Sequence, residues 1–142
     1  MFTYPLTTRW ADMDPNRHVR HSVYADYCAQ ARVMFFQQAG FTMQRLGELG
    51  VGPILFREEL KYLRELGLGE AITVTVELGW AEETGRKWQL VHQILKADGT
   101  KSAHVVVDGA WIDLLARRVI APPPEVANLI AHLQPYLAPV QG

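Results

Sequence analysis

Hydrophobic residues recur along this chain with two periods, one typical of strands and one typical of a helix. Residues 71–80 (AITVTVELGW) alternate apolar with polar side chains, which predicts a strand with one covered face. From Ser22 onward the apolar spacing changes to three and four residues, which predicts a long helix with one buried face. The apolar positions of that stripe are Val23, Tyr24, Tyr27, Cys28, Ala31, Met34 and Phe35. Ser22 is the expected N-cap and Gly40 the expected stop.

The remaining segments complete an α+β plan. Residues 2–10 predict a first strand, which Pro5 favours at a sheet edge, and residues 42–49 predict a second helix that ends at Gly50. Further strands are expected at 54–63, 87–96 and 101–113, and a short terminal helix is expected to open at Pro124. Short turns between neighbouring strands imply antiparallel pairing. Residues 1–142 are therefore expected to form a single domain, with a helix packed on an antiparallel sheet.

Composition narrows the class of protein. With 142 residues, 49% of them hydrophobic and 20% charged, the chain is large and apolar enough to fold without a disulfide or a metal. Its single cysteine, Cys28, allows no internal disulfide and no cysteine-based zinc site, so we expect a cytoplasmic protein. On the apolar stripe, Cys28 is interpreted as a small buried hydrophobe and not as a nucleophile.

Charge and hydropathy argue against two kinds of partner. The net charge of −1 lacks the basic excess usual in domains that bind nucleic acid. No window reaches 18 uninterrupted apolar residues, and the first ten residues do not resemble a signal peptide, so we expect no membrane segment.

Candidate chemistry gathers in residues 11–21 (ADMDPNRHVRH), which have no strand or helix period and must form a loop. The loop holds Asp12, Asp14, His18 and His21 just before a predicted helix. A carboxylate there can attack a thioester carbonyl or activate water, while N–H groups of the first helical turn can stabilise an oxyanion. From the residues alone, turn and capping roles for the two aspartates are the commoner explanation. A metal held by the two histidines lacks a third strong ligand pattern, so no metal is expected.

The run RWADMDPNRHVRHSVYADYCAQAR, residues 9–32, resembles the opening signature of hotdog thioesterases of the 4-hydroxybenzoyl-CoA and acyl-CoA thioesterase type. The stretch EELKYLRELGLGE, residues 58–70, resembles the strand and glycine turn that follow in that family. The resemblance implies a hotdog fold, in which a long central helix packs on a curved antiparallel sheet. It also implies hydrolysis of an acyl-CoA thioester to free acid and CoA, with no cofactor.

The resemblance assigns roles within the loop. Asp14 is similar to the family's catalytic carboxylate, and its role as nucleophile or general base stays open. His21 matches the residue whose backbone N–H faces the thioester carbonyl, so it is the second catalytic candidate. Asp12 and His18 are expected to hold the loop in shape. Arg17 departs from the pattern, because many members have glycine there and a non-glycine residue is costly at positive φ.

The resemblance also implies partners. Arg86 and Lys87 match the strand start that contacts the nucleotide phosphates of CoA in the family. A solvated hairpin end explains the two residues equally well. The active site is expected at the interface of a homodimer that continues the sheet, with homotetramers built from two dimers. The run Val105–Val107, apolar on both sides of its strand, also argues against a free sheet edge. The alternative function is a non-catalytic acyl-CoA-binding hotdog module, and a hotdog dehydratase ranks last.

Overall fold

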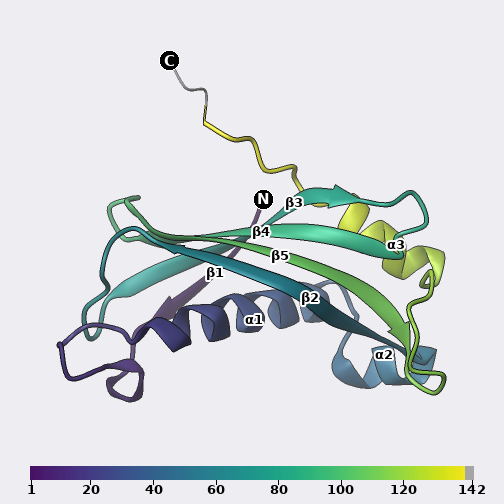
Figure 1. The fold of residues 1–142 in the computed structure, drawn as a ribbon, viewed down its shortest axis with the longest axis horizontal. Helices are drawn as coiled ribbons and strands as arrows, with labels where there is room; N and C mark the ends of the chain where they lie inside the picture. Colours follow the sequence, from purple (N-terminus) through teal and green to yellow (C-terminus); the bar gives the residue numbers. More distant parts are fainter. Residues whose placement is uncertain (140–142) are drawn as a thin grey trace.

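The computed structural model describes residues 1–139 and is built around one long helix (Figure 1). In chain order its elements are β1 (Phe2–Thr7), a 3-10 turn (Trp10–Asp12), α1 (His21–Gln38), α2 (Met43–Leu49), β2 (Val51–Tyr62), β3 (Ala71–Ala81), β4 (Lys87–Lys96), β5 (Lys101–Asp113) and α3 (Pro124–Ala131). The predicted element types are therefore confirmed along the chain. Two boundaries moved by three residues: β1 ends three residues before the predicted end, and β2 begins three residues before the predicted start.

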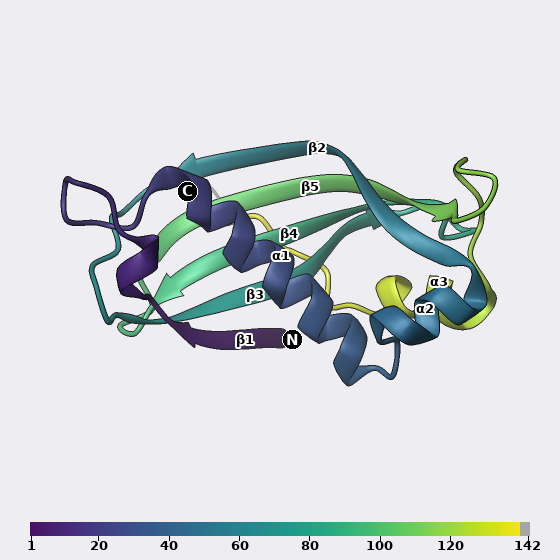
Figure 2. The ribbon, with the colours of Figure 1, turned by 90° about the horizontal axis from the view of Figure 1, so that it is seen from below.

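The five strands form one antiparallel sheet in the order β1-β3-β4-β5-β2. The sheet bends around α1, which lies across its concave face (Figure 2). This is the α+β hotdog arrangement that the sequence predicted. β1 lies at one edge, as Pro5 indicated, and β2 lies at the other.

The core lies between α1 and the concave face of the sheet. Residues of the helical stripe, including Tyr24, Cys28 and Phe36, are buried against side chains such as Val74 and Trp111. Burial raises the pKa of the Cys28 thiol to about 12, so the side chain stays a neutral hydrophobe. None of the helices in residues 1–139 combines the length and apolar character that a bilayer crossing requires.

The start of α1 corrects one prediction. The helix begins at His21, its N-cap is Arg20, and no side chain caps it. Ser22 is therefore inside the helix and not its cap. The first turn is closed by the Val23 N–H, which donates to Arg20 O at 3.1 Å, so the helix starts two residues closer to the polar loop than an N-cap at Ser22 predicted.

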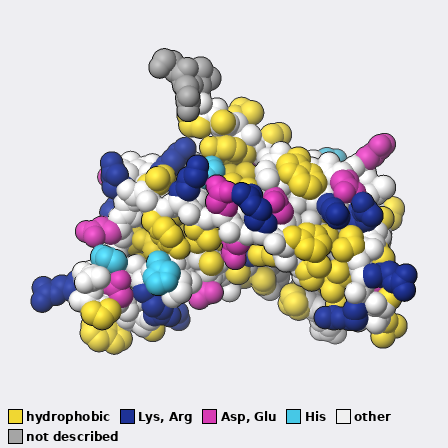
Figure 3. All heavy atoms as spheres, in the orientation of Figure 1, with side chains coloured by type: hydrophobic (Ala, Val, Ile, Leu, Met, Phe, Trp, Pro, Cys, Tyr) yellow, Lys and Arg dark blue, Asp and Glu magenta, His cyan; other side chains and the backbone are white. Residues whose placement is uncertain are grey.

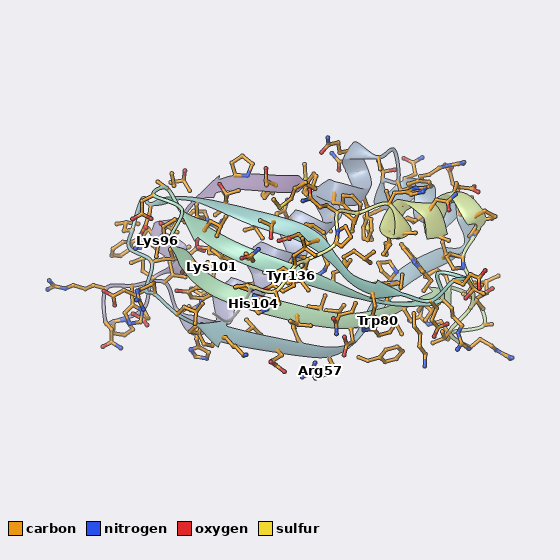
Figure 4. All side chains as sticks on the ribbon, turned by 90° about the horizontal axis from the view of Figure 1, so that it is seen from above. Arg57, Trp80, Lys96, Lys101, His104 and Tyr136 are labelled. Atoms are coloured by element: carbon orange, nitrogen blue, oxygen red, sulfur yellow. The ribbon has the colours of Figure 1, made fainter. Side chains whose placement is uncertain are left out.

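The expectation of a single covered face on β3 was also wrong. Thr75 and Glu77, on the face away from α1, are only 1% and 5% exposed. The segment after α3 crosses this face, where the Tyr136 N–H donates to Leu78 O at 2.8 Å. Figure 4, seen from the side opposite α1, shows the Tyr136 ring lying close to His104, with ring centroids 5.2 Å apart.

The apolar run Val105–Val107 was also wrongly taken as a reason for a dimer. Its strand, β5, lies between β4 and β2 and has no free edge. The edge strands are β1 and β2, and β2 has exposed apolar side chains, with Leu55 38% and Phe56 58% exposed. Figure 3 shows apolar side chains in two groups on this side of the molecule, separated by a band of charged side chains. The candidate edge for sheet extension is therefore β2.

Candidate functional site

The loop between the 3-10 turn and α1 is a small closed hairpin. A bridge between Met13 and Val19 closes it, and the Asp14 N–H donates to His18 O at 2.9 Å. At its tip Arg17 has a φ of 67°, in the left-handed region where glycine is favoured. The departure noted in the sequence therefore falls on a position that does need positive φ. A non-glycine residue there costs roughly 1–2 kcal/mol.

The Asp14 carboxylate has one oxygen bound within the loop and one near an imidazole. Oδ1 accepts the Asn16 N–H at 2.9 Å, with a longer contact of 3.4 Å to the His18 N–H. Oδ2 lies 3.2 Å from His18 Nδ1, which is also 3.1 Å from Val19 O. Two acceptors face Nδ1, so this nitrogen carries a proton and donates to them.

Asp14 is accessible from one side. Its side chain is 18% exposed and lines a cavity of about 800 Å³ together with Trp10, Met13, Arg17 and Leu68. A carboxylate oxygen held this way can reach a reacting group without leaving its loop. The geometry suits either a nucleophile or a general base.

Asp12, two residues earlier, has a different environment. It is 1% exposed and accepts the Arg9 backbone N–H at 3.0 Å, Arg9 Nη2 at 2.9 Å and the Tyr27 hydroxyl at 2.7 Å. Burial would raise the pKa of Asp12, but the donors from Arg9 and Tyr27 outweigh it and hold the pKa below its usual range. Burial and the same carboxylate raise the pKa of Tyr27. These contacts suit a residue that fixes the loop to α1.

Arg9 and Tyr27 were not identified from the sequence. Across the 3-10 turn the Asp12 N–H donates to Arg9 O and the Arg9 N–H donates to Asp12 Oδ2, both at 3.0 Å. Opposite charges three residues apart could have indicated this pair. Tyr27 was assigned only to the apolar stripe of the helix. Its hydroxyl became a loop contact because α1 packs directly beside the 3-10 turn.

His21 opens α1 at a second pocket, of about 260 Å³, that it shares with His18, Tyr24 and Tyr62. The Tyr62 hydroxyl donates to His21 O at 3.2 Å, so β2 and the helix start are joined here. The first N–H groups of a helix have no intrahelical acceptor and favour developing negative charge. Asp14 does not line this pocket. His18 connects the two places, since it lines the pocket and contacts Asp14.

Arg86 and Lys87 lie at the start of β4, and the turn between β3 and β4 is at the opposite end of the sheet from the loop before α1 (Figure 1). Arg86 Nε is 3.3 Å from Glu82 Oε2, and Lys87 Nζ is 6.0 Å from the centre of the Phe56 ring. A single chain therefore does not bring this basic pair to the loop that holds Asp14. Within residues 1–139 no three His, Cys, Asp or Glu side chains gather closely enough to hold a metal ion.

Comparison with known proteins identifies the family of this chain. A family model described as the thioesterase-like superfamily matches residues 8–130. The chain is similar to a hypothetical Staphylococcus aureus protein solved in complex with CoA, with 25% identity and a TM-score of 0.89 over 99% of this chain and 89% of that one.

Two further structures share the fold at lower identity. They are a 1,4-dihydroxy-2-naphthoyl-CoA thioesterase from Synechocystis (18% identity, TM-score 0.82, 93% of this chain and 96% of that one) and a probable thioesterase, YbaW, from Escherichia coli (18%, 0.80, 94% and 98%). No curated protein matches the chain. Because the family model spans most of the sequence, the chain belongs to the thioesterase-like superfamily and has its hotdog fold.

Proposed function

We propose that this protein hydrolyses acyl-CoA thioesters, with Asp14 as the reactive carboxylate. The proposal rests on the environment of Asp14: Oδ1 is bound within the loop, Oδ2 contacts His18, and the partly exposed side chain lines a cavity. Membership of the superfamily supports thioester hydrolysis, and the similarity to a protein solved with CoA supports CoA esters as the substrate class.

Two routes use the same groups. In one, Asp14 attacks the thioester carbonyl, a carbon–oxygen bond forms, the carbon–sulfur bond breaks and CoA leaves as a thiolate that takes a proton. Water then cleaves the mixed anhydride, restores the carboxylate and releases the acid. In the other, Asp14 takes a proton from water, the hydroxide attacks the carbonyl, and the proton passes to the leaving thiolate. In both, N–H groups at the His21 end of α1 stabilise the oxyanion.

We further propose a two-fold dimer in which two β2 edges pair antiparallel. The exposed Leu55 and Phe56 and the unpaired backbone of β2 favour such a contact. This pairing would set the Arg86 end of one sheet beside the Asp14 end of the other, and so bring Arg86 and Lys87 within reach of CoA phosphates. Two such dimers would form the expected tetramer. The single buried thiol is compatible with the reducing cytoplasm, which we propose as the compartment.

A thiol-release assay across short, long and aromatic acyl-CoAs tests the activity, and light scattering at micromolar concentration tests the assembly. Hydrolysis of at least one class, by a protein with the mass of two or four chains, is expected. Binding of CoA esters without any thiol release would favour the non-catalytic module instead. A fully active monomer would contradict the shared site.

A further inference from the structure

A positively charged side chain lies in the core beside α1. Arg32 is only 9% exposed, and its Nη1 lies 3.0 Å from His92 Nε2. His92 Nδ1 lies 2.8 Å from Thr75 O, and burial followed by the Arg32 charge lowers the pKa of His92 to about 3. The imidazole is therefore neutral, with Nδ1–H donating to Thr75 and Nε2 accepting from Arg32. The partner of the Arg32 charge is thus a neutral group.

The guanidinium retains donors for another acceptor. It has five N–H groups, and within residues 1–139 its hydrogen bond is the one to His92, with no carboxylate within 4.0 Å. Glu58 on β2 acts on it from a longer distance, and the Cys28 thiol beside it is neutral. Burying a charge is costly unless it is paired, which favours binding of an anion at this place.

Arg32 also lines a cavity of about 210 Å³ between α1 and the edge strand β2. Its other walls are apolar and include Val33, Phe36, Leu55 and Trp88. The Nε1–H of Trp88 is buried and has no acceptor among the described residues, so the wall contains a second unpaired donor. A narrow apolar space with one cation suits a chain that is apolar along its length and anionic at its end.

The cavity lies on the same face of α1 as His21, where the oxyanion is proposed to bind. Ala25, Ala29 and Val33 follow His21 at four-residue intervals, which places all four on one face of the helix. The two alanines are half-buried, and Ala29 lines the Arg32 cavity. Small side chains therefore occupy the face of α1 between the His21 pocket and Arg32. Eleven residues separate His21 from Arg32 in the sequence, which is about 16 Å along a helix, and the lean of the side chain toward the N-terminus shortens this to about 10 Å.

We propose that the acyl group of the substrate ends in a carboxylate that binds Arg32, so that the preferred substrates are CoA monothioesters of dicarboxylic acids. The inference rests on the proposed thioesterase function and names its substrate class. An extended chain covers about 1.2 Å per bond, so the distance from His21 to Arg32 suits acids of about eight to twelve carbons. A carboxylate matches the guanidinium fork in geometry and charge, whereas a terminal methyl group would leave the cation unpaired.

The test compares thioesters of equal length that differ only at the far end. We would measure kcat/KM by thiol release for the CoA monothioesters of octanedioic, decanedioic and dodecanedioic acids against octanoyl-, decanoyl- and dodecanoyl-CoA. The wild-type protein is expected to prefer the carboxylated ester at least tenfold at one or more lengths. Equal or better turnover of the neutral esters at every length would overturn the proposal, and this comparison needs no variant to fold.

Variants then assign the preference to the cation. Arg32→Gln is expected to reduce the ratio of carboxylated to neutral kcat/KM at least tenfold, and Arg32→Lys to reduce it less. Arg45→Gln is the matched control, because Arg45 lies on the neighbouring helix α2 and its charge is exposed beside Glu48. It should keep the wild-type ratio. An unchanged ratio in a folded Arg32→Gln protein would contradict the assignment.

Failure of the proposed function gives a different result. If no ester releases thiol, titration calorimetry with the same paired esters still compares their affinities for the wild-type protein and for Arg32→Gln. Tighter binding of the carboxylated esters that is lost in Arg32→Gln would keep the anion site and reject hydrolysis. Equal affinities for both series would reject the anion site.

Discussion

Asp12 and Asp14 are chemically identical and only two residues apart, yet the fold places them in opposite environments. Asp12 is 1% exposed, and donors from Arg9 and Tyr27 fill its two oxygens. The Asp14 side chain is 18% exposed, and a 3.2 Å contact to His18 is all that holds its Oδ2 within the described chain. A carboxylate surrounded by donors stabilises a loop, whereas one with an accessible oxygen can react.

The environment of a carboxylate, and not its presence in a motif, therefore separates a structural role from a chemical one. Both aspartates belong to the same D-x-D pattern, and their sequence spacing says nothing about exposure. The difference arises because α1 supplies the Tyr27 hydroxyl to Asp12, whereas Asp14 lies in the hairpin before α1 and lines a cavity. Substitutions at four positions of this loop test the comparison between Asp12 and Asp14.

The largest effect is expected from Asp14→Asn, which should lower the rate of thiol release at least about a hundredfold, on the scale of a lost acid or base. The Asn Oδ1 can still accept the Asn16 N–H, so the melting temperature should stay close to that of the wild type. Activity and thermal unfolding measured on the same preparation check this. Near-normal turnover by a folded variant would remove Asp14 from the mechanism.

Asp12→Asn should act on stability. Removing the charge that accepts from Arg9 and Tyr27 is expected to lower the free energy of unfolding by about 2 kcal/mol at neutral pH. The pKa of Asp12 is lowered in the folded protein, so its stabilisation is present above its unfolded pKa of about 3.9 and is lost as the pH falls through the folded value. We would measure the free energy of unfolding in urea at pH 7 and below pH 4. The difference between Asp12→Asn and the wild type should be smaller in acid. A pH-independent difference would mean that the charge does not matter.

His18→Ala tests how firmly the reactive oxygen of Asp14 is oriented. We expect kcat to fall about tenfold with a smaller change in KM, because the imidazole positions the carboxylate and does not bind the thioester. His18→Gln retains an N–H donor near the same place and should recover part of kcat. An increase in KM alone would instead assign His18 to the pocket that it shares with His21.

The smallest effect is expected from Arg17→Gly. Relief of the positive φ of 67° should raise the free energy of unfolding, partly offset by the greater freedom of glycine in the unfolded chain, for a net gain of about 1 kcal/mol or less. Thermal and urea unfolding measure this gain. A loss of stability would show that the Arg17 side chain contributes contacts that outweigh the backbone cost.

The sequence by itself determined what depends on neighbours along the chain. The period of two in residues 71–80 and the helical stripe after Ser22 indicated the elements, since each period reflects which side chains share a face. The closed loop before α1 was visible because Asp14 and Pro15 interrupt both periods. The resemblance also drew attention to Arg17, because many family members have glycine at this position, and the structure shows that its φ is 67°.

Only the tertiary structure decided what joins distant segments. Strand order is set by packing over the whole sheet, so the sequence could not show that β5 is internal and β2 free. Arg32 and His92 are 60 residues apart, and they are in contact because α1 crosses the sheet over β4 (Figure 2). The covered outer face of β3 likewise depends on the return of residues 134–136. Burial and pairing of polar groups are long-range properties, and they determine which residues of a local motif remain free to react.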